Sequence, residues 1–133
     1  MRDWGLLFTS AVGSGVYPDR GDAKPAAIRK AAASARLEYF EVDLKAVKSK
    51  ETMLDWIGRE LSFPDYFGTN WDALYDCLTD MEWKPAPGYV IMLNQFEKFS
   101  EKCYEDAETA MDIFTAAALH WKKKGYPFYI ILS

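Results

Sequence analysis

Hydrophobic residues along the chain form two patterns, continuous runs and helical repeats, and these patterns alternate. Continuous apolar runs at residues 89–93 and 128–132 are typical of strands that are covered on both faces. Residues 37–44 have the β-branched and aromatic content of another strand. Helical spacing or alanine-rich composition predicts helices over residues 22–34, 49–61, 70–79 and 105–124. Because strands alternate with helices, the sequence predicts an α/β fold with a small parallel β-sheet packed with helices.

The first 22 residues carry weaker signals. They contain a short apolar piece, Leu6-Leu7-Phe8, followed by residues 13–18, where glycine and proline predict turns. No internal repeat and no long linker interrupts the remaining chain. We therefore expect residues 1–133 to form a single domain.

Composition narrows the class of protein. Half of the 133 residues are apolar, so a sizeable core can form and a disordered chain is excluded. Two cysteines are too few for a disulfide scaffold and indicate a reducing compartment. No apolar run approaches the ~18 residues of a membrane helix, and the N-terminal apolar stretch is too short for a signal peptide. We expect a soluble protein of the cytoplasm.

Charge is distributed unevenly along the chain, whose formal net charge is −4. Residues 62–112 contain three Lys or Arg against eleven Asp or Glu, a net charge of −8, whereas residues 1–61 have a net charge of +1. No basic residue lies between Arg59 and Lys84. This segregation has two readings, a solvated face that maintains solubility or a surface that attracts a cationic partner.

The helix predicted over residues 70–79 has a sharply divided surface. Asn70 is a favourable N-cap, and Leu74, Cys77, Leu78 and Met81 form one apolar stripe. The opposite face carries Asp72, Asp76 and Asp80, spaced four residues apart. Each such like-charge pair costs roughly 0.2–0.5 kcal/mol. An uncompensated cost of this kind is typical of sites where function overrides stability.

Three interpretations of this aspartate row remain open. It could be a solvated stripe screened by salt. It could bind a divalent cation, although no third ligand or phosphate-binding motif lies nearby. It could also imitate nucleic-acid phosphates and occupy the basic site of an RNA-binding protein, with Tyr66 and Tyr75 as aromatic anchors.

The sequence lacks the groups that an enzyme needs. His120 is the single histidine and lies on a predicted helix among apolar residues, where a packing or surface role is expected. Cys77 lies on the core stripe and is interpreted as a small buried hydrophobe. No nucleophile, base and orienting group come together, so we do not expect an enzyme.

The segment Tyr66-Phe67-Gly68-Thr69-Asn70-Trp71-Asp72-Ala73-Leu74-Tyr75-Asp76-Cys77-Leu78-Thr79 closely resembles the signature of the barstar family, inhibitors of barnase-type ribonucleases. The ending Ile130-Ile131-Leu132-Ser133 is also similar to the last strand of that family. The resemblance covers residues 36–133. It implies a barstar-like fold, with residues 1–35 as an N-terminal extension that adds a strand/helix element, as in longer bacterial members.

The resemblance also implies which residues contact a ribonuclease. Asp76 matches the aspartate that enters the enzyme's active site, and Asp72 matches a second charged contact. The other matched positions are Tyr66, Gly68, Asn70, Tyr75 and Thr79. Tyr75 and Met81 stand where the family has tryptophan, and Asp80 replaces a glycine and could extend the acidic row. The family's glutamate contact on the long helix falls near Ala116.

Taken together, these features predict an intracellular inhibitor of a small basic ribonuclease of the barnase-like, extracellular type. Its acidic helix would block the active site by imitating RNA phosphates. We expect a monomer that uses no cofactor, holds no metal, binds no nucleic acid directly and has no membrane association. The alternative is a barstar-like interaction or regulatory module that binds another cationic protein without inhibiting a ribonuclease.

Overall fold

A four-stranded parallel sheet with strand order β1-β4-β3-β2 forms the centre of the fold. The computed structural model describes residues 2–64 and 69–133. The strands are β1 (Gly15–Pro18), β2 (Glu38–Asp43), β3 (Tyr89–Asn94) and β4 (Phe128–Leu132). All neighbouring strands run parallel, which confirms the predicted α/β fold with a small parallel sheet.

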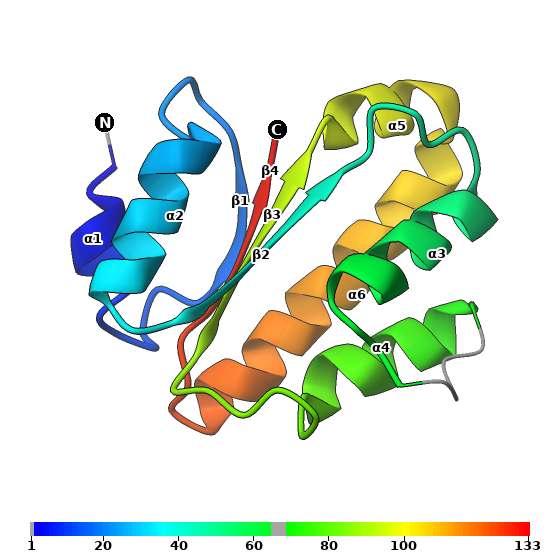
Figure 1. Cartoon of the computed structure of the whole chain (residues 1–133). Helices are drawn as coiled ribbons and strands as arrows, with labels where there is room; N and C mark the ends of the chain where they lie inside the picture. Colours follow the sequence, from blue (N-terminus) through cyan, green and yellow to red (C-terminus); the bar gives the residue numbers. More distant parts are fainter. Residues whose placement is uncertain (1, 65–68) are drawn as a thin grey trace.

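Helices cover both faces of this sheet (Figure 1). One face carries α1 (Trp4–Leu7) and α2 (Pro25–Ser34). The other carries α3 (Lys50–Glu60), α4 (Trp71–Asp80), α5 (Phe96–Lys102) and α6 (Tyr104–Lys123). Each helix predicted from the sequence is present with bounds close to those expected.

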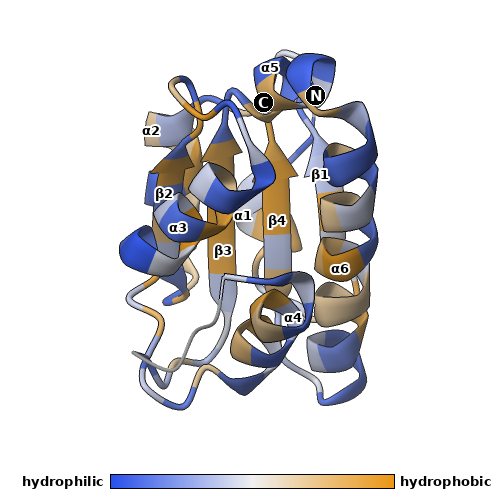
Figure 2. Ribbon diagram, turned by 90° about the vertical axis from the view of Figure 1, so that its right-hand side faces the viewer, coloured by the Kyte–Doolittle hydropathy of each residue, from blue (hydrophilic) through white to orange (hydrophobic). Residues whose placement is uncertain are grey.

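The two central strands contribute to two separate cores. Tyr89, Ile91 and Leu93 of β3 belong to the core beneath α3–α6, whereas Val90 and Met92 belong to the core beneath α1 and α2. This alternation follows from the period of two in a β-strand. It explains why residues 89–93 form a continuous apolar run rather than an alternating one, as the colouring of β3 illustrates in Figure 2.

The N-terminal region adds β1 and α1, which the local sequence did not predict. The turn expected over residues 13–18 is wrong in part, because Gly15–Pro18 pairs with β4. The Tyr129 hydroxyl lies 2.6 Å from the Leu7 carbonyl oxygen and 2.8 Å from that of Ser10, and so fastens α1 and the following loop to β4. The extra N-terminal strand and helix are therefore present. The division of the chain into residues 1–35 and 36–133 remains a prediction.

Helix α5 was also not predicted. It follows β3 directly, with Gln95 at its N-cap in the left-handed region (φ 67°). Its core-facing residues are Phe96 and Phe99, three positions apart and both buried. A helix of seven residues shows too few turns for its periodicity to stand out in the sequence.

Candidate protein-binding surface

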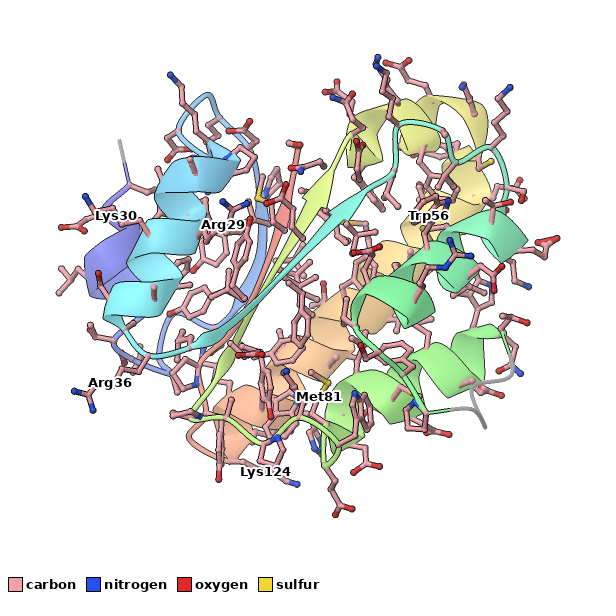
Figure 3. All side chains as sticks on the ribbon, viewed as in Figure 1. Arg29, Lys30, Arg36, Trp56, Met81 and Lys124 are labelled. Carbon is pink, nitrogen blue, oxygen red and sulfur yellow. The ribbon has the colours of Figure 1, made fainter. Side chains whose placement is uncertain are left out.

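The beginning and end of α4 are set by specific residues. The Asn70 side chain accepts a hydrogen bond from the Ala73 N–H at 2.8 Å, which confirms the predicted N-cap. The helix ends at Met81, whose backbone is left-handed (φ 54°) and whose N–H donates to the Cys77 carbonyl. The Met81 side chain is buried and lies between α4 and the sheet (Figure 3). Met81 thus both terminates the helix and fills the core.

The inner face of α4 is packed as the hydrophobic pattern predicts. Leu74, Cys77 and Leu78 are at most 1% exposed. The Trp121 indole N–H of α6 donates to the Leu78 carbonyl oxygen at 2.8 Å in a buried environment. Because apolar packing and this hydrogen bond both hold the helix, the orientation of its outer face is fixed before any partner arrives.

The outer face of α4 carries the predicted carboxylates. Asp72 and Asp76 are exposed, whereas Asp80, in the last turn before the chain bends inward at Met81, is half-buried. Within residues 2–64 and 69–133, neither Asp72 nor Asp76 forms an ion pair. Two of the three aspartates are therefore exposed and form no ion pair within these residues.

Thr79 and Tyr75 complete this surface. The Thr79 hydroxyl donates to the Tyr75 carbonyl oxygen at 2.9 Å, so it is turned back toward the helix backbone. Tyr75 and Trp71 are half-buried, as expected for residues at the border of the two faces. The Lys50 ammonium group of α3 lies 5.3 Å from the centre of the Trp71 ring, a cation–π contact that helps to position this ring.

A groove of about 510 Å³ separates the outer face of α4 from α6, which lie side by side in Figures 1 and 2. Helix α4 contributes Trp71, Asp72, Tyr75 and Asp76, and α6 contributes Asp112 and Ala116 among others. Ala116, near which the family's α6 contact was expected, thus faces the groove without a charge. Asp112 is a lining residue of this groove that the sequence analysis did not single out.

Cys77 and His120 belong to residue types that enzymes use in catalysis, and the pKa of each is shifted. Burial raises the pKa of the Cys77 thiol to about 11, and the negative charges of Asp76 and Asp80 act in the same direction. Burial and the nearby Lys124 lower the pKa of His120, against the opposing effect of the Thr79 backbone. At neutral pH, Cys77 is therefore a protonated thiol, which is a poor nucleophile.

The described residues offer no third protein ligand for a divalent cation at the aspartate row. Among the described residues, no group of three His, Cys, Asp or Glu side chains is arranged to hold a metal ion. The same part of the chain contains no helix with the length and apolar character needed to cross a membrane.

Six of the eight residues predicted to bind a partner lie on α4 or at its N-cap. These are Asn70, Asp72, Tyr75, Asp76, Thr79 and Asp80. The remaining two, Tyr66 and Gly68, lie outside the described residues. The binding role of all eight remains a prediction, and the structure adds Asp112 to the residues around the same groove.

Comparison with known proteins places this surface in a family context. Residues 37–133 match the family model described as "Barstar (barnase inhibitor)". The chain is also 39% identical over 56 residues to a protein of Bacillus subtilis (strain 168) described as "Putative ribonuclease inhibitor YrdF". That match covers 42% of this chain and 58% of the Bacillus protein. Both descriptions indicate an inhibitor rather than an enzyme. Because the family model spans most of its length, the chain belongs to the barstar family.

Proposed function

We propose that this protein inhibits a small basic, barnase-like ribonuclease by covering its active site with α4. It acts as a monomer, without a cofactor, in the cytoplasm of the cell that makes the ribonuclease. The observation that carries the proposal is the pair Asp72 and Asp76, exposed one helical turn apart and without an ion-pair partner in the described ranges.

The chemistry of RNA recognition explains why such a pair is suited to inhibition. A ribonuclease binds the phosphates of its substrate with arginine and lysine side chains. Two carboxylates about 6 Å apart along a rigid helix offer these side chains negative charges in place of phosphates. Asp76 takes the main position and Asp72 the second. The carboxylates contain no bond that the enzyme can cleave, so the enzyme does not consume the inhibitor, and we expect a stoichiometric complex.

The residues around this pair supply contact area and shape. The Tyr75 ring, half-buried beside Asp76, serves as an aromatic anchor of the kind common in tight interfaces. Tyr66 and Gly68, which precede α4 in the sequence, are further proposed contacts, together with Asn70 at the N-cap and Thr79 and Asp80 at the far end of the helix. The Asn70 side-chain oxygen caps α4 and so fixes where the helix begins.

A titration tests this function. Purified protein is added to barnase and to a panel of related basic ribonucleases, and RNA cleavage is measured. We expect cleavage by at least one enzyme to fall to zero at an equimolar ratio. Because exposed charges guide the encounter, association should slow as salt is raised.

Two results would contradict the proposal. In one, no ribonuclease of the panel is inhibited. In the other, a ribonuclease binds with full retention of RNA cleavage, which favours the alternative of an interaction module. Substitutions that remove one α4 carboxylate need a control that removes one charge elsewhere. Glu101→Gln provides it, because Glu101 is exposed on α5 and lies outside the α4–α6 groove.

A further inference from the structure

The last turn of α4 is held by groups that lie outside the helix. It contains no basic residue and ends in Asp80, so its own sequence does not offset the partial negative charge of a helix C-terminus. Helix α6 contacts this turn through two consecutive residues. The Trp121 indole N–H donates to the Leu78 carbonyl oxygen at 2.8 Å, and His120 lies beside the Thr79 backbone. The position of the end of α4 therefore depends on α6.

The imidazole of His120 has a defined orientation and one nitrogen without a hydrogen bond. Its ring meets that of Trp121 edge-on, with 5.6 Å between the ring centres. The Nε2 atom is buried and has no hydrogen-bond partner among the described residues. In a neutral imidazole the nitrogen without a proton is only an acceptor, and leaving it unpaired costs less than burying a charge. This environment therefore suits the neutral ring better than the protonated one.

The charged groups near His120 come from α6 and α4. On α6, the ammonium group of Lys124, four residues further along, opposes a positive charge on the ring. On α4, the Thr79 backbone favours that charge, whereas the carboxylates on either side of it in the sequence, Asp76 and Asp80, do not contribute to the shift. Burial and Lys124 together outweigh the backbone, so the pKa of His120 lies below its usual value of about 6.5.

On the basis of the proposed function, we propose that His120 is a positioning residue whose neutral ring keeps the last turn of α4 in place for the ribonuclease, so that protonation of the ring weakens the complex. It acts through the backbone at Thr79. The basic groups of a bound ribonuclease lie close to α4 and disfavour a further positive charge there. His120 is therefore harder to protonate in the complex than in the free protein, and by linkage the affinity falls when the free protein takes up a proton.

The titration of His120 can be observed directly, because it is the single histidine of the chain. The protein alone is isotopically labelled, and its imidazole signals are followed by NMR from about pH 8 to about pH 5. The measurement is made on the free protein and on its complex with the ribonuclease that it inhibits best. We expect a pKa below about 6.5 in the free protein and a lower one in the complex. A pKa that is equal or higher in the complex would refute the coupling.

His120→Gln tests the effect on binding, since glutamine offers a side-chain amide but does not titrate. The Kd for the same ribonuclease is measured for the variant and the unchanged protein. Titration of the enzyme and of the α4 carboxylates affects both proteins alike, so the ratio of the two Kd values isolates His120. We expect the Kd of the unchanged protein, relative to that of the variant, to rise at least about threefold between about pH 7 and about pH 5.5. A merely structural role would give a ratio that does not change with pH, which would overturn the proposal.

Lys124→Gln provides a second test with a matched control. Lys124 lies at the same end of the molecule as Met81, the residue that terminates α4 (Figure 3). Removing its charge should raise the pKa of His120 and move the loss of affinity to higher pH. Lys102→Gln removes an equal charge from an exposed position on α5 and should leave both unchanged. Equal effects of the two lysine variants would contradict the local action of Lys124 on the ring.

The outcomes separate this inference from the function on which it rests. Inhibition of a ribonuclease with a Kd ratio that is constant with pH would refute the role of His120 and leave the inhibitor function intact. Failure of the unchanged protein to inhibit any ribonuclease of the panel would instead refute the proposed function.

Discussion

Aspartates on the two sides of the sheet differ in whether they form ion pairs. On the α1–α2 side, the Arg2 guanidinium donates to both carboxylate oxygens of Asp22 at 2.8 Å. These hydrogen bonds hold the pKa of Asp22 well below its usual range. On the α4 side, Asp72 and Asp76 have no ion pair within the described residues. One region uses its charge to hold its own chain together, and the other leaves two exposed carboxylates without an ion pair in the described residues.

The basic residues reinforce this contrast. Arg29, Lys30 and Arg36 are exposed on and beside α2, on the opposite side of the sheet from α4 (Figure 3). Arg29 is paired with Glu41 at 3.0 Å. Since the positive charges of α2 lie far from the aspartates of α4, they do little to neutralise them. We therefore expect substitutions on the α4 side to change ribonuclease binding and substitutions on the α1–α2 side to change the free energy of unfolding.

The largest expected effect is that of Asp76→Ala on ribonuclease binding. Removing the central carboxylate leaves basic groups of the enzyme buried without a partner, so we expect a loss of at least about 2 kcal/mol, or roughly 30-fold in Kd. Asp80→Ala should cost much less, because Asp80 is half-buried at the end of the helix. Equilibrium binding to the inhibited ribonuclease measures both. Equal and negligible losses would contradict the comparison.

Tyr129→Phe should have the converse effect. It removes the buried hydroxyl that contacts the Leu7 and Ser10 carbonyls, so we expect the free energy of unfolding to fall by about 1–2 kcal/mol, with the Kd for a ribonuclease unchanged. Urea denaturation gives the first quantity and titration the second. Tyr126→Phe, at a tyrosine that is 40% exposed, is the control. A loss of binding as large as the loss of stability would show that the two sides are not independent.

The Arg2–Asp22 pair makes the stability of the α1–α2 side dependent on pH. The folded-state pKa of Asp22 lies below its unfolded value of about 4, so its contribution is complete above that pH and is lost as the pH falls toward the folded pKa. We expect Asp22→Asn to lower the urea midpoint at pH 7 and the difference from the unchanged protein to shrink below about pH 4. A difference that stays constant from pH 7 to pH 3 would exclude this role.

The smallest expected effect is a gain in stability. Asp76→Asn removes two like-charge spacings, with Asp72 and with Asp80, so we expect α4 to gain about 0.4–1 kcal/mol at low salt, with the gain reduced at high salt. Replicate urea titrations at two salt concentrations measure it. A variant that is more stable but binds its ribonuclease poorly would show that Asp76 lowers the stability of the fold while it contributes to binding. A destabilised variant would indicate an internal role for the carboxylate.

The local parts of this architecture were predictable from the sequence. Asn70 marked the start of α4, the spacing of Leu74, Cys77 and Leu78 marked its inner face, and the continuous run of β4 marked a strand with two covered faces. Each of these follows from a signal within a few residues.

The parts that were missed depend on contacts between distant segments. Strand β1 is a short edge strand whose pairing partner, β4, lies more than a hundred positions away, and its Gly15 and Pro18 resemble turn residues. Asp112 carries no local mark of function, because only the packing of α6 beside α4 brings it to the groove. Sequence analysis therefore identified the acidic helix, and the resemblance pointed to the long helix near Ala116, but neither singled out Asp112.

Competition between this protein and RNA tests the central claim most directly. A catalytically inactive variant of the inhibited ribonuclease is mixed with increasing concentrations of a short oligonucleotide. The apparent Kd of this protein for the ribonuclease is measured at each concentration. If the α4 carboxylates take the place of phosphates, the apparent Kd of this protein rises linearly with oligonucleotide concentration. Asp76→Ala should then weaken the binding of this protein to the ribonuclease and leave the affinity of the ribonuclease for the oligonucleotide unchanged. An apparent Kd that does not change with oligonucleotide would contradict the account, because the protein would then bind elsewhere on the enzyme.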